Sequence, residues 1–499
     1  MKTLSRIVIA LIIIAMTLPM ALACAETVEQ EETTAAPVAT QAPVATEETT
    51  VEETLFAPSN IPDDLKFEGT TLSILHWDDA HLVEFFAEVE NGESVNDAIY
   101  WRNEKIEDQF GINLEFTGMN GNYSNRKKFV NACVNNVMSG ADVYDMFCGY
   151  SMTGASIMSE GISQDLTNYD ILDLDSPWWP ESLISKARIK DGIYFVSGDI
   201  STNFLYMMYL CIFNKDLFAS IKQQDVSVLY NLVHDGEWTI DKLLEYTNDT
   251  YLDLDADQAV SEGDRFGITV TSVHNDSFYT GADLESVYVN ADGDLAMSED
   301  LFSERTVNLL EKVCDLIHNS GNGYNKKGVE IFANGTVLFV VDRPNVIATN
   351  LTSVDFSFGI LPIPKYDADQ DGYKTCLSFP YTVYMISTAS KNAEAAAATI
   401  ELMAYENYVN VTPVLFEETM KARYADQSDD AFMFDYIRKG VVIDIGRLFC
   451  IQLDNMSYSI FRTAVNKNAA GSYASTAGQY TKTFNMMLKD INKSLDKLK

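Results

Sequence analysis

Four aspartates lie close together in one stretch of the chain, with a spacing that is typical of a calcium loop. They occupy positions 1, 3, 5 and 12 of an EF-hand-like pattern: Asp253, Asp255, Asp257 and Asp264. Position 6 is glutamine where the pattern has glycine, and position 12 is aspartate where it has a bidentate glutamate. The stretch is therefore either a structural calcium site or an acidic turn that caps its own backbone.

Aromatic and polar side chains end two of the expected strands. Trp77 and Asp79 follow an apolar run that begins at Thr71, and Tyr150 and Ser151 follow another. The sheets of α/β proteins present ligand-binding residues at the carboxyl ends of their strands. Rings stack on the apolar faces of a sugar, and carboxylates accept hydrogen bonds from its hydroxyls. These four residues are candidates for ligand binding, although most rings in such a chain belong to the core.

The net charge restricts the partners of the protein. Among 499 residues, 73 are acidic and 35 are Lys or Arg, which gives a formal charge of −38. Such a field repels phosphate backbones and anionic lipid, so we expect no nucleic-acid partner and no polybasic membrane contact. The acidic residues are spread along the chain, which is typical of a solvated surface.

Motifs of several large enzyme classes are missing from the sequence. It has no HExxH, no GxSxG nucleophile elbow, no P-loop and no dinucleotide-binding glycine pattern. Pairs of carboxylates are so common in this chain that they do not identify a glycosidase. We therefore expect a protein that is not an enzyme, with a secreted carbohydrate-active enzyme as an alternative.

The first residues have the pattern of an export signal. Residues 1–23 combine two basic residues with an apolar run and the small-residue sequence Ala-Leu-Ala, which predicts a signal peptide. Cys24 follows directly, where a bacterial lipoprotein carries its lipidated cysteine, although the lipobox is imperfect. Ordinary cleavage after Ala25, giving a soluble secreted protein, is the alternative.

A polar segment follows the cysteine. Residues 25–58 contain eight Glu and no Lys or Arg, so they have little to bury, and we expect a disordered linker over 24–65. A flexible tether suits a protein that is attached at one end. We therefore expect an exported protein held at the outer face of the cell membrane through a lipid anchor only, because no later apolar run is long enough to span a bilayer.

Strand and helix patterns alternate after residue 62. Strands are expected over 71–77, 112–117 and 143–148, and helices over 96–110, 124–138 and the C-terminal 476–499. This rhythm predicts an α/β fold with mostly parallel sheets, and the length favours two lobes. The cysteines after Cys24 lie largely in apolar stretches, so we expect buried free thiols, with some pairing as the alternative in an exported protein.

Several stretches, in order over residues 69 to 499, carry a resemblance to a known family. The strongest is DGIYFVSGDISTNFLYMMYLCIFNKDL (191–217), and two of the others are FANGTVLFVVDRP (332–344) and SYSIFRTAVNKNAA (457–470). With these motifs the chain resembles the carbohydrate-binding, maltose-binding-protein-like solute receptors of ABC importers, especially the long Gram-positive lipoproteins.

The resemblance implies a two-lobed, type II periplasmic-binding-protein-like fold, with a hinge of crossover strands and a ligand cleft between the lobes. Lobe one would comprise 66–199 and 330–368, and lobe two 200–329 and 369–499. Ligand contacts to both lobes would stabilise a closed state that the importer recognises.

The resemblance also implies further ligand-binding residues. Asp199 would face the cleft from a crossover, with a turn or helix cap as the alternative role. Asp342 and Arg343 follow a strand at a cleft position, or form an ion pair within one lobe. Tyr279 and Tyr458 would line the cleft from lobe two, Tyr458 as an aromatic platform.

The function that the resemblance implies is capture of an extracellular sugar, in particular an oligosaccharide, and its delivery to the permease subunits of an ABC transporter. We expect a monomer without a cofactor other than the possible structural calcium. A receptor for a peptide or another small polar solute is the alternative ligand class.

Overall fold

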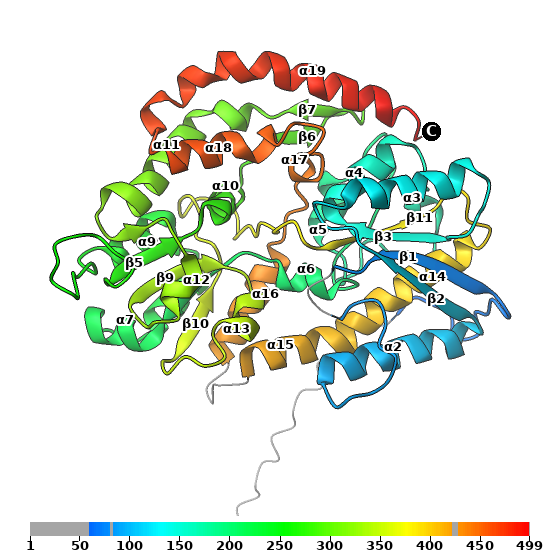
Figure 1. Cartoon of the computed structure of the whole chain (residues 1–499), viewed down its shortest axis with the longest axis horizontal. Coiled ribbons are helices and arrows are strands. Elements are labelled where there is room, and N and C mark those ends of the chain that lie inside the picture. The colour runs from blue at the N-terminus through cyan, green and yellow to red at the C-terminus, as the bar shows by residue number, and fades with distance from the viewer. Residues whose placement is uncertain (1–58, 80–82, 422–427, 499) are drawn as a thin grey trace, which may run out of the picture. The chain divides into compact units, whose positions relative to one another are not determined.

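The computed structural model describes residues 59–79, 83–421 and 428–498 (Figure 1). They belong to one compact unit, Phe56–Lys499. The expected signal peptide 1–23 and Cys24 lie outside the described residues. The expected linker extends too far, because Ile61, within 24–65, is buried in the core.

The first sheet has four strands in the order β11-β3-β1-β2 (Figure 1). Their bounds are β1 Thr71–Trp77, β2 Asn113–Met119, β3 Met146–Tyr150 and β11 Thr382–Ile386. β1 runs parallel to β2 and β3, and β11 runs antiparallel to β3. The carboxyl ends of β1 and β3 therefore lie at one edge of the sheet, together with the start of β11.

The second sheet has five strands in the order β10-β4-β9-β5-β8. Their bounds are β4 Leu210–Asn214, β5 Phe266–Val270, β8 Gly323–Tyr324, β9 Val337–Asp342 and β10 Phe358–Leu361. β5 is parallel to β8 and β9, whereas β4 is antiparallel to β9 and β10. A separate antiparallel hairpin consists of β6 Val287–Val289 and β7 Leu295–Met297.

Helices pack on both sheets. Helices α2, α3, α4 and α14 contact one another or the first sheet, and α7, α8, α9, α12 and α16 contact the second (Figure 1). The α-helices are α2 Ser94–Phe110, α3 Arg126–Met138, α4 Ser151–Ser159, α5 Glu181–Lys186, α6 Thr202–Tyr206, α7 Lys215–Lys222, α8 Ser227–His234, α9 Ile240–Thr247, α10 Asp276–Gly281, α11 Glu304–Cys314, α12 Gly328–Phe332, α13 Asn345–Thr349, α14 Ala393–Glu406, α15 Thr412–Lys421, α16 Ser428–Lys439, α17 Ile445–Leu448, α18 Met456–Asn466 and α19 Ala477–Leu495. None of the helices in the described ranges has both the length and the apolar character that a membrane span requires.

Local sequence explains the first α/β units. The strand expected over 71–77 is β1, and the helix expected over 96–110 is α2, which begins two residues earlier. α2 ends at Gly111, whose φ of 67° lies in the left-handed region and whose N–H donates to the Glu107 carbonyl (2.8 Å). Glycine adopts this conformation without steric cost, so the helix stops and the chain turns into β2.

The strand pairing contradicts part of the expected division into lobes. Residues 330–368 were expected in lobe one, but they contain β9 and β10, which pair with β4 and β5 in the second sheet. Conversely β11, expected in lobe two, pairs with β3 of the first sheet. Buried strands of both sheets share the same apolar composition, so the pattern along the chain does not identify the partner of a strand.

The six cysteines in the described part of the chain are all buried and free: Cys133, Cys148, Cys211, Cys314, Cys376 and Cys450. Burial raises the pKa of the Cys314 thiol to about 11, so it stays protonated at neutral pH. This agrees with the expectation of buried free thiols, and the described cysteines form no disulfide.

Candidate functional site

Segments that adjoin both sheets meet around one arginine. Arg447, in α17, lines two small cavities. Ser151, which follows β3, and Tyr381, which precedes β11, line one of them. Tyr279, on the α10 helix that follows β5, and Tyr458, on α18, line the other. The fold therefore brings candidate residues from both sheets to one place.

A buried aspartate joins two guanidinium groups there. Asp276, which is 4% exposed, accepts a hydrogen bond from Nη1 of Arg447 (2.6 Å) and one from Nε of Arg462 (2.8 Å). Nη2 of Arg462 also donates to Asp276. Burial opposes the charge of Arg462, but the hydrogen bonds to Asp276 raise the pKa of this guanidinium above its ordinary value. Both arginines are therefore fixed in position and charged.

Each of these arginines covers an aromatic ring. The guanidinium carbon of Arg447 lies 4.1 Å from the ring centroid of Phe379, and that of Arg462 lies 4.3 Å from the centroid of Tyr458. The two rings are 5.3 Å apart at an interplanar angle of 57°. We call Asp276, Phe379, Arg447, Tyr458 and Arg462 the Arg447 cluster. Rings, guanidinium donors and a carboxylate together are the groups that bind sugar hydroxyls and faces.

Of the candidate residues at the ends of β1 and β3, Ser151 contacts the cluster directly. Tyr150 packs against Trp77 with ring centroids 5.3 Å apart, and burial raises the pKa of Tyr150 above its ordinary value. Oγ of Ser151 donates to the Phe379 carbonyl (2.5 Å). Trp77 is 1% exposed, and its Nε1 donates to Oγ1 of Thr382 (2.8 Å), so in this conformation its ring belongs to the core.

Asp79 and Tyr279 bond to their own surroundings. Oδ2 of Asp79 accepts the backbone N–H groups of Gly121 (2.7 Å) and Asn122 (2.9 Å), which fixes the loop after β2. The hydroxyl of Tyr279 donates to the Glu285 carbonyl (3.2 Å), while its ring lines the cavity next to Tyr458. Tyr279 thus shapes one wall of the candidate site, whereas the carboxylate of Asp79 orders a loop.

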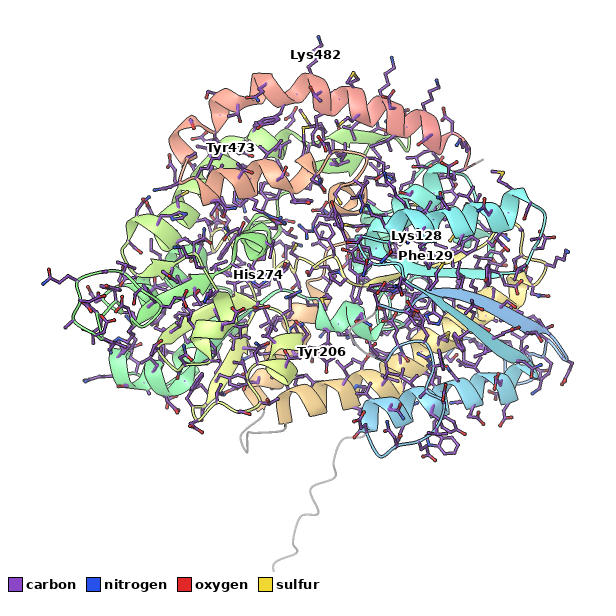
Figure 2. All side chains as sticks on the ribbon, in the orientation of Figure 1. Lys128, Phe129, Tyr206, His274, Tyr473 and Lys482 are labelled. Atoms are coloured by element: carbon purple, nitrogen blue, oxygen red, sulfur yellow. The ribbon has the colours of Figure 1, made fainter. Side chains whose placement is uncertain are left out.

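Asp342 and Arg343 form the ion pair that was the alternative to a ligand-binding role. Oδ1 of Asp342 accepts hydrogen bonds from the backbone N–H (2.9 Å) and Nε (3.3 Å) of Arg343. Oδ2 lies 3.7 Å from Nδ1 of His274. Burial lowers the pKa of this histidine, which Figure 2 labels in the interior of the molecule. Nη1 of Arg343 reaches Oγ of Ser378 (3.4 Å), so this pair connects β9 to the segment that leads into β11.

Asp199 lies apart from the Arg447 cluster. Its carboxylate accepts hydrogen bonds from Oγ1 of Thr412 (2.7 Å) and Nη2 of Arg438 (2.9 Å). It lines a different cavity, of about 600 Å³, which shares no lining residue with the two cavities at Arg447.

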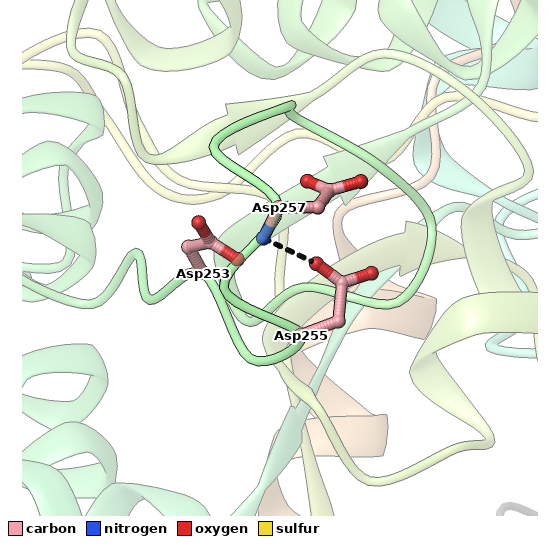
Figure 3. A group of neighbouring side chains, drawn as sticks. All are labelled: Asp253, Asp255 and Asp257. Carbon is pink, nitrogen blue, oxygen red and sulfur yellow. Dashed lines mark hydrogen bonds between the residues drawn. The ribbon is translucent and has the colours of Figure 1, made fainter.

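Three of the four aspartates of the calcium pattern lie together. One ligand atom from each of Asp253, Asp255 and Asp257 lies within 4.8 Å of the others (Figure 3). The fourth, Asp264, is fully buried and accepts the N–H groups of Leu254 (3.2 Å) and Ser261 (2.8 Å). In this conformation three of the four expected carboxylates therefore lie together, and the buried Asp264 stabilises the loop through its hydrogen bonds to the backbone.

Sequence reasoning missed most of the Arg447 cluster. Asp276, Phe379 and Arg447 belong to no motif, and only the folded chain brings them together. Arg462 could have been found, because it stands four residues after Tyr458 in a helical stretch, a spacing that places both on one face of α18.

Little empty space remains at the cluster. The two cavities have volumes of about 10 Å³ each, which is roughly the space of a single water. A ligand larger than one water fits at this site only if the side chains move or the two sheets separate, and hinge motions of this kind are common in two-lobed proteins.

Comparison with known proteins shows the fold. No protein-family model and no curated protein matches the chain. A cyclic alpha-maltosyl-1,6-maltose binding protein from Arthrobacter globiformis is 15% identical over 86% of this chain and 99% of its own, with a TM-score of 0.53. The GacH receptor of Streptomyces glaucescens is 14% identical over 85% of this chain and 99% of its own, with a TM-score of 0.51.

A third structure has the same arrangement. An ABC substrate-binding protein from Listeria monocytogenes, solved with cycloalternan, is 13% identical over 86% of this chain and all of its own, with a TM-score of 0.50. These similarities confirm the predicted fold class: the chain has the α/β, two-lobed, type II periplasmic-binding-protein-like fold.

Proposed function

We propose that the protein binds an extracellular oligosaccharide between its two lobes and delivers it to the permease of an ABC transporter. The observation that carries this proposal is the Arg447 cluster, in which two arginine-covered rings and a shared carboxylate lie where segments from both sheets meet. A ligand that contacts both lobes stabilises the closed state, so its binding is coupled to closure of the lobes.

The ligand class is supported by two kinds of evidence. The similar structures are of proteins that bind a cyclic maltosyl-maltose, cycloalternan or acarbose. The two guanidinium groups of the cluster face two carboxylates, Asp276, which contacts both of them, and Asp444, which lines both cavities, so the charges of the site are largely balanced internally. A neutral ligand with many hydroxyls suits this arrangement better than a charged peptide terminus.

The proposal includes transport without catalysis, and export with a lipid anchor at Cys24. The similar structures carry the names of binding proteins and receptors, which supports a binding role. Mass spectrometry of the native protein tests the anchor. A diacylglyceryl Cys24 is the expected N-terminus, and an unmodified chain that begins after Ala25 would show the soluble secreted form instead.

Titration of the mature chain with maltotetraose, cyclodextrins and β-linked oligosaccharides tests the proposed function. We expect one sugar series to raise the melting temperature, because ligand at 100 times its Kd adds about 2.7 kcal/mol to the free energy of unfolding. No product should form on long incubation. Product would show an enzyme, and a response to peptides alone would show the alternative ligand class.

Substitution at the platform tests the site. We expect Tyr458→Ala to weaken sugar binding by about tenfold or more, because a ring that stacks on the ligand contributes about 1–3 kcal/mol. Tyr288→Ala is the control, since Tyr288 is an exposed tyrosine on β6 and lines neither cavity at Arg447. Equal affinities in both variants would remove the cluster as the binding site.

We also propose structural calcium at Asp253, Asp255 and Asp257. The support is the spacing of the pattern and the close approach of the three carboxylates. We expect a chelator to lower the melting temperature of the wild type and to leave that of Asp253→Asn unchanged. A wild-type protein that contains no calcium after purification and does not respond to added calcium would contradict this proposal.

A further inference from the structure

The cavity of about 600 Å³ beside Asp199 lies outside the Arg447 cluster. Its walls come from four separate parts of the chain, and three of them contribute an aromatic side chain. Trp179 precedes α5, Phe204 lies in α6, and Tyr408 follows α14. A molecule bound there would touch three aromatic side chains without contacting the cluster.

A buried ion pair forms part of the wall. Asp199, which is 4% exposed, receives Nη2 (2.9 Å) and Nε (3.3 Å) of Arg438, and Nη2 also donates to the Pro177 carbonyl (3.1 Å). Burial opposes the charge of Arg438, but Asp199 raises the pKa of the guanidinium above its ordinary value. The guanidinium is therefore charged and held in a fixed orientation between α16 and the segment before α5.

This guanidinium also has a free donor position within the described chain. Its carbon lies 4.9 Å from the ring centroid of Tyr408. No described residue accepts a hydrogen bond from Nη1 of Arg438. The cavity thus combines an oriented hydrogen-bond donor with a ring beside it. The Arg447 cluster contains two guanidinium–ring pairs of the same kind.

The charges around the cavity favour a neutral ligand. Asp199 and Arg438 neutralise each other, so the wall has no net charge from this pair. The remaining charged groups are the exposed Asp175, Glu181 and Lys439, and the excess of carboxylates disfavours anions. The volume falls within the range of roughly 300–1,000 Å³ that is usual for small-molecule sites.

We propose that this cavity is a second carbohydrate site, which takes one or two neutral sugar rings between Trp179, Phe204 and Tyr408, with Arg438 as a hydrogen-bond donor. The ligand class rests on the proposed function, but the residues are different ones. The two proposals can therefore fail separately.

Saturation-transfer NMR and calorimetry on the mature chain test the second site, with D-glucose, maltose and cellobiose as probes at millimolar concentration. We expect Tyr408→Ala to weaken binding of at least one probe about tenfold or more. Ser185→Trp should have the same effect, because an indole at this exposed position fills the cavity without removing the ion pair. Tyr458→Ala is the matched variant in the cluster and should leave this binding event unchanged.

The outcomes separate the two sites. Loss of one binding event in Tyr408→Ala and Ser185→Trp, with retention in Tyr458→Ala, supports the second site even if the cluster proves not to bind sugar. The proposal is overturned if no probe binds, or if both cavity variants bind all probes as the wild type does. Circular dichroism of each variant confirms that its fold is intact.

Discussion

Replacing Asp276 with asparagine removes the charge that holds the Arg447 cluster together and changes the side-chain volume little. The carboxylate is 3% exposed and contacts Arg447 and Arg462, which are themselves largely buried. Asparagine can still accept a hydrogen bond from one of them. The variant therefore leaves two guanidinium charges close together in a poorly hydrated place.

The expected cost follows from burial. Removing one partner of a buried ion pair costs about 3–5 kcal/mol, because the remaining charge is left uncompensated. Asp276 has two charged partners, so we expect a loss at the upper end of this range. Asp241→Asn is the matched control: its carboxylate pairs with Lys312 at 2.6 Å but is 61% exposed. Exposed pairs contribute about 0–1 kcal/mol.

Urea unfolding of the two variants measures the difference. We expect a large fall in the unfolding midpoint for Asp276→Asn, a small one for Asp241→Asn, and similar slopes, since the surface exposed on unfolding is the same. The small loss in Asp241→Asn should shrink further at high salt, whereas that in Asp276→Asn should persist. Equal, small losses in both variants would show that the cluster is hydrated, and the account of its electrostatics would be wrong.

Three further variants test other parts of the structure. Burial raises the pKa of Glu401 to about 8 from its ordinary 4.5, so between these pH values the folded state holds a proton that the unfolded state releases, and the stability from this group, fully present below pH 4.5, is lost as the pH rises to about 8. In Glu401→Gln the urea midpoint should therefore change less with pH over that interval. A midpoint that depends on pH as it does in the wild type would contradict the raised pKa. Trp77→Phe removes the hydrogen bond from Nε1 to Thr382 and should cost about 1–3 kcal/mol, and an unaltered midpoint would show that this bond is dispensable. Gly111→Ala places a Cβ 2.7 Å from the Glu68 carboxylate at a φ of 67°. We therefore expect the free energy of unfolding to fall by about 1 kcal/mol or more in the same assay. An unchanged free energy would mean that the turn relaxes without cost.

The strand pattern predicted where the candidate residues Trp77 and Tyr150 lie along their strands, but not whether they are exposed. The prediction that Trp77 and Tyr150 each end a strand agrees with the first sheet, where they are the last residues of β1 and β3. Their exposure could not be predicted, because it depends on what covers them. Tyr150 and Thr382 come from distant parts of the chain, and they close off the ring of Trp77.

The roles of the two arginines, by contrast, could not be predicted from the sequence. Arg447 and Arg438 are ordinary basic residues in the sequence, and each charged guanidinium is held in one orientation because a distant aspartate lies opposite it. Asp199 was expected to face the ligand cleft; it pairs with Arg438 and lines a cavity apart from the Arg447 cluster. Such pairs depend on contacts between segments that are 171 and 239 residues apart, which no local pattern encodes.

The sequence by itself determined the local elements, since strand and helix periodicity, caps such as Gly111 and apolar composition act over a few residues. It also determined the acidic surface and, through ordered motifs, the fold class. Only the tertiary structure decided that β9 and β10 join the second sheet and β11 the first, and which rings and charges stay accessible. The reason is physical: pairing and burial are set by the sum of many long-range contacts, and residues of the same type exchange roles when their neighbours change.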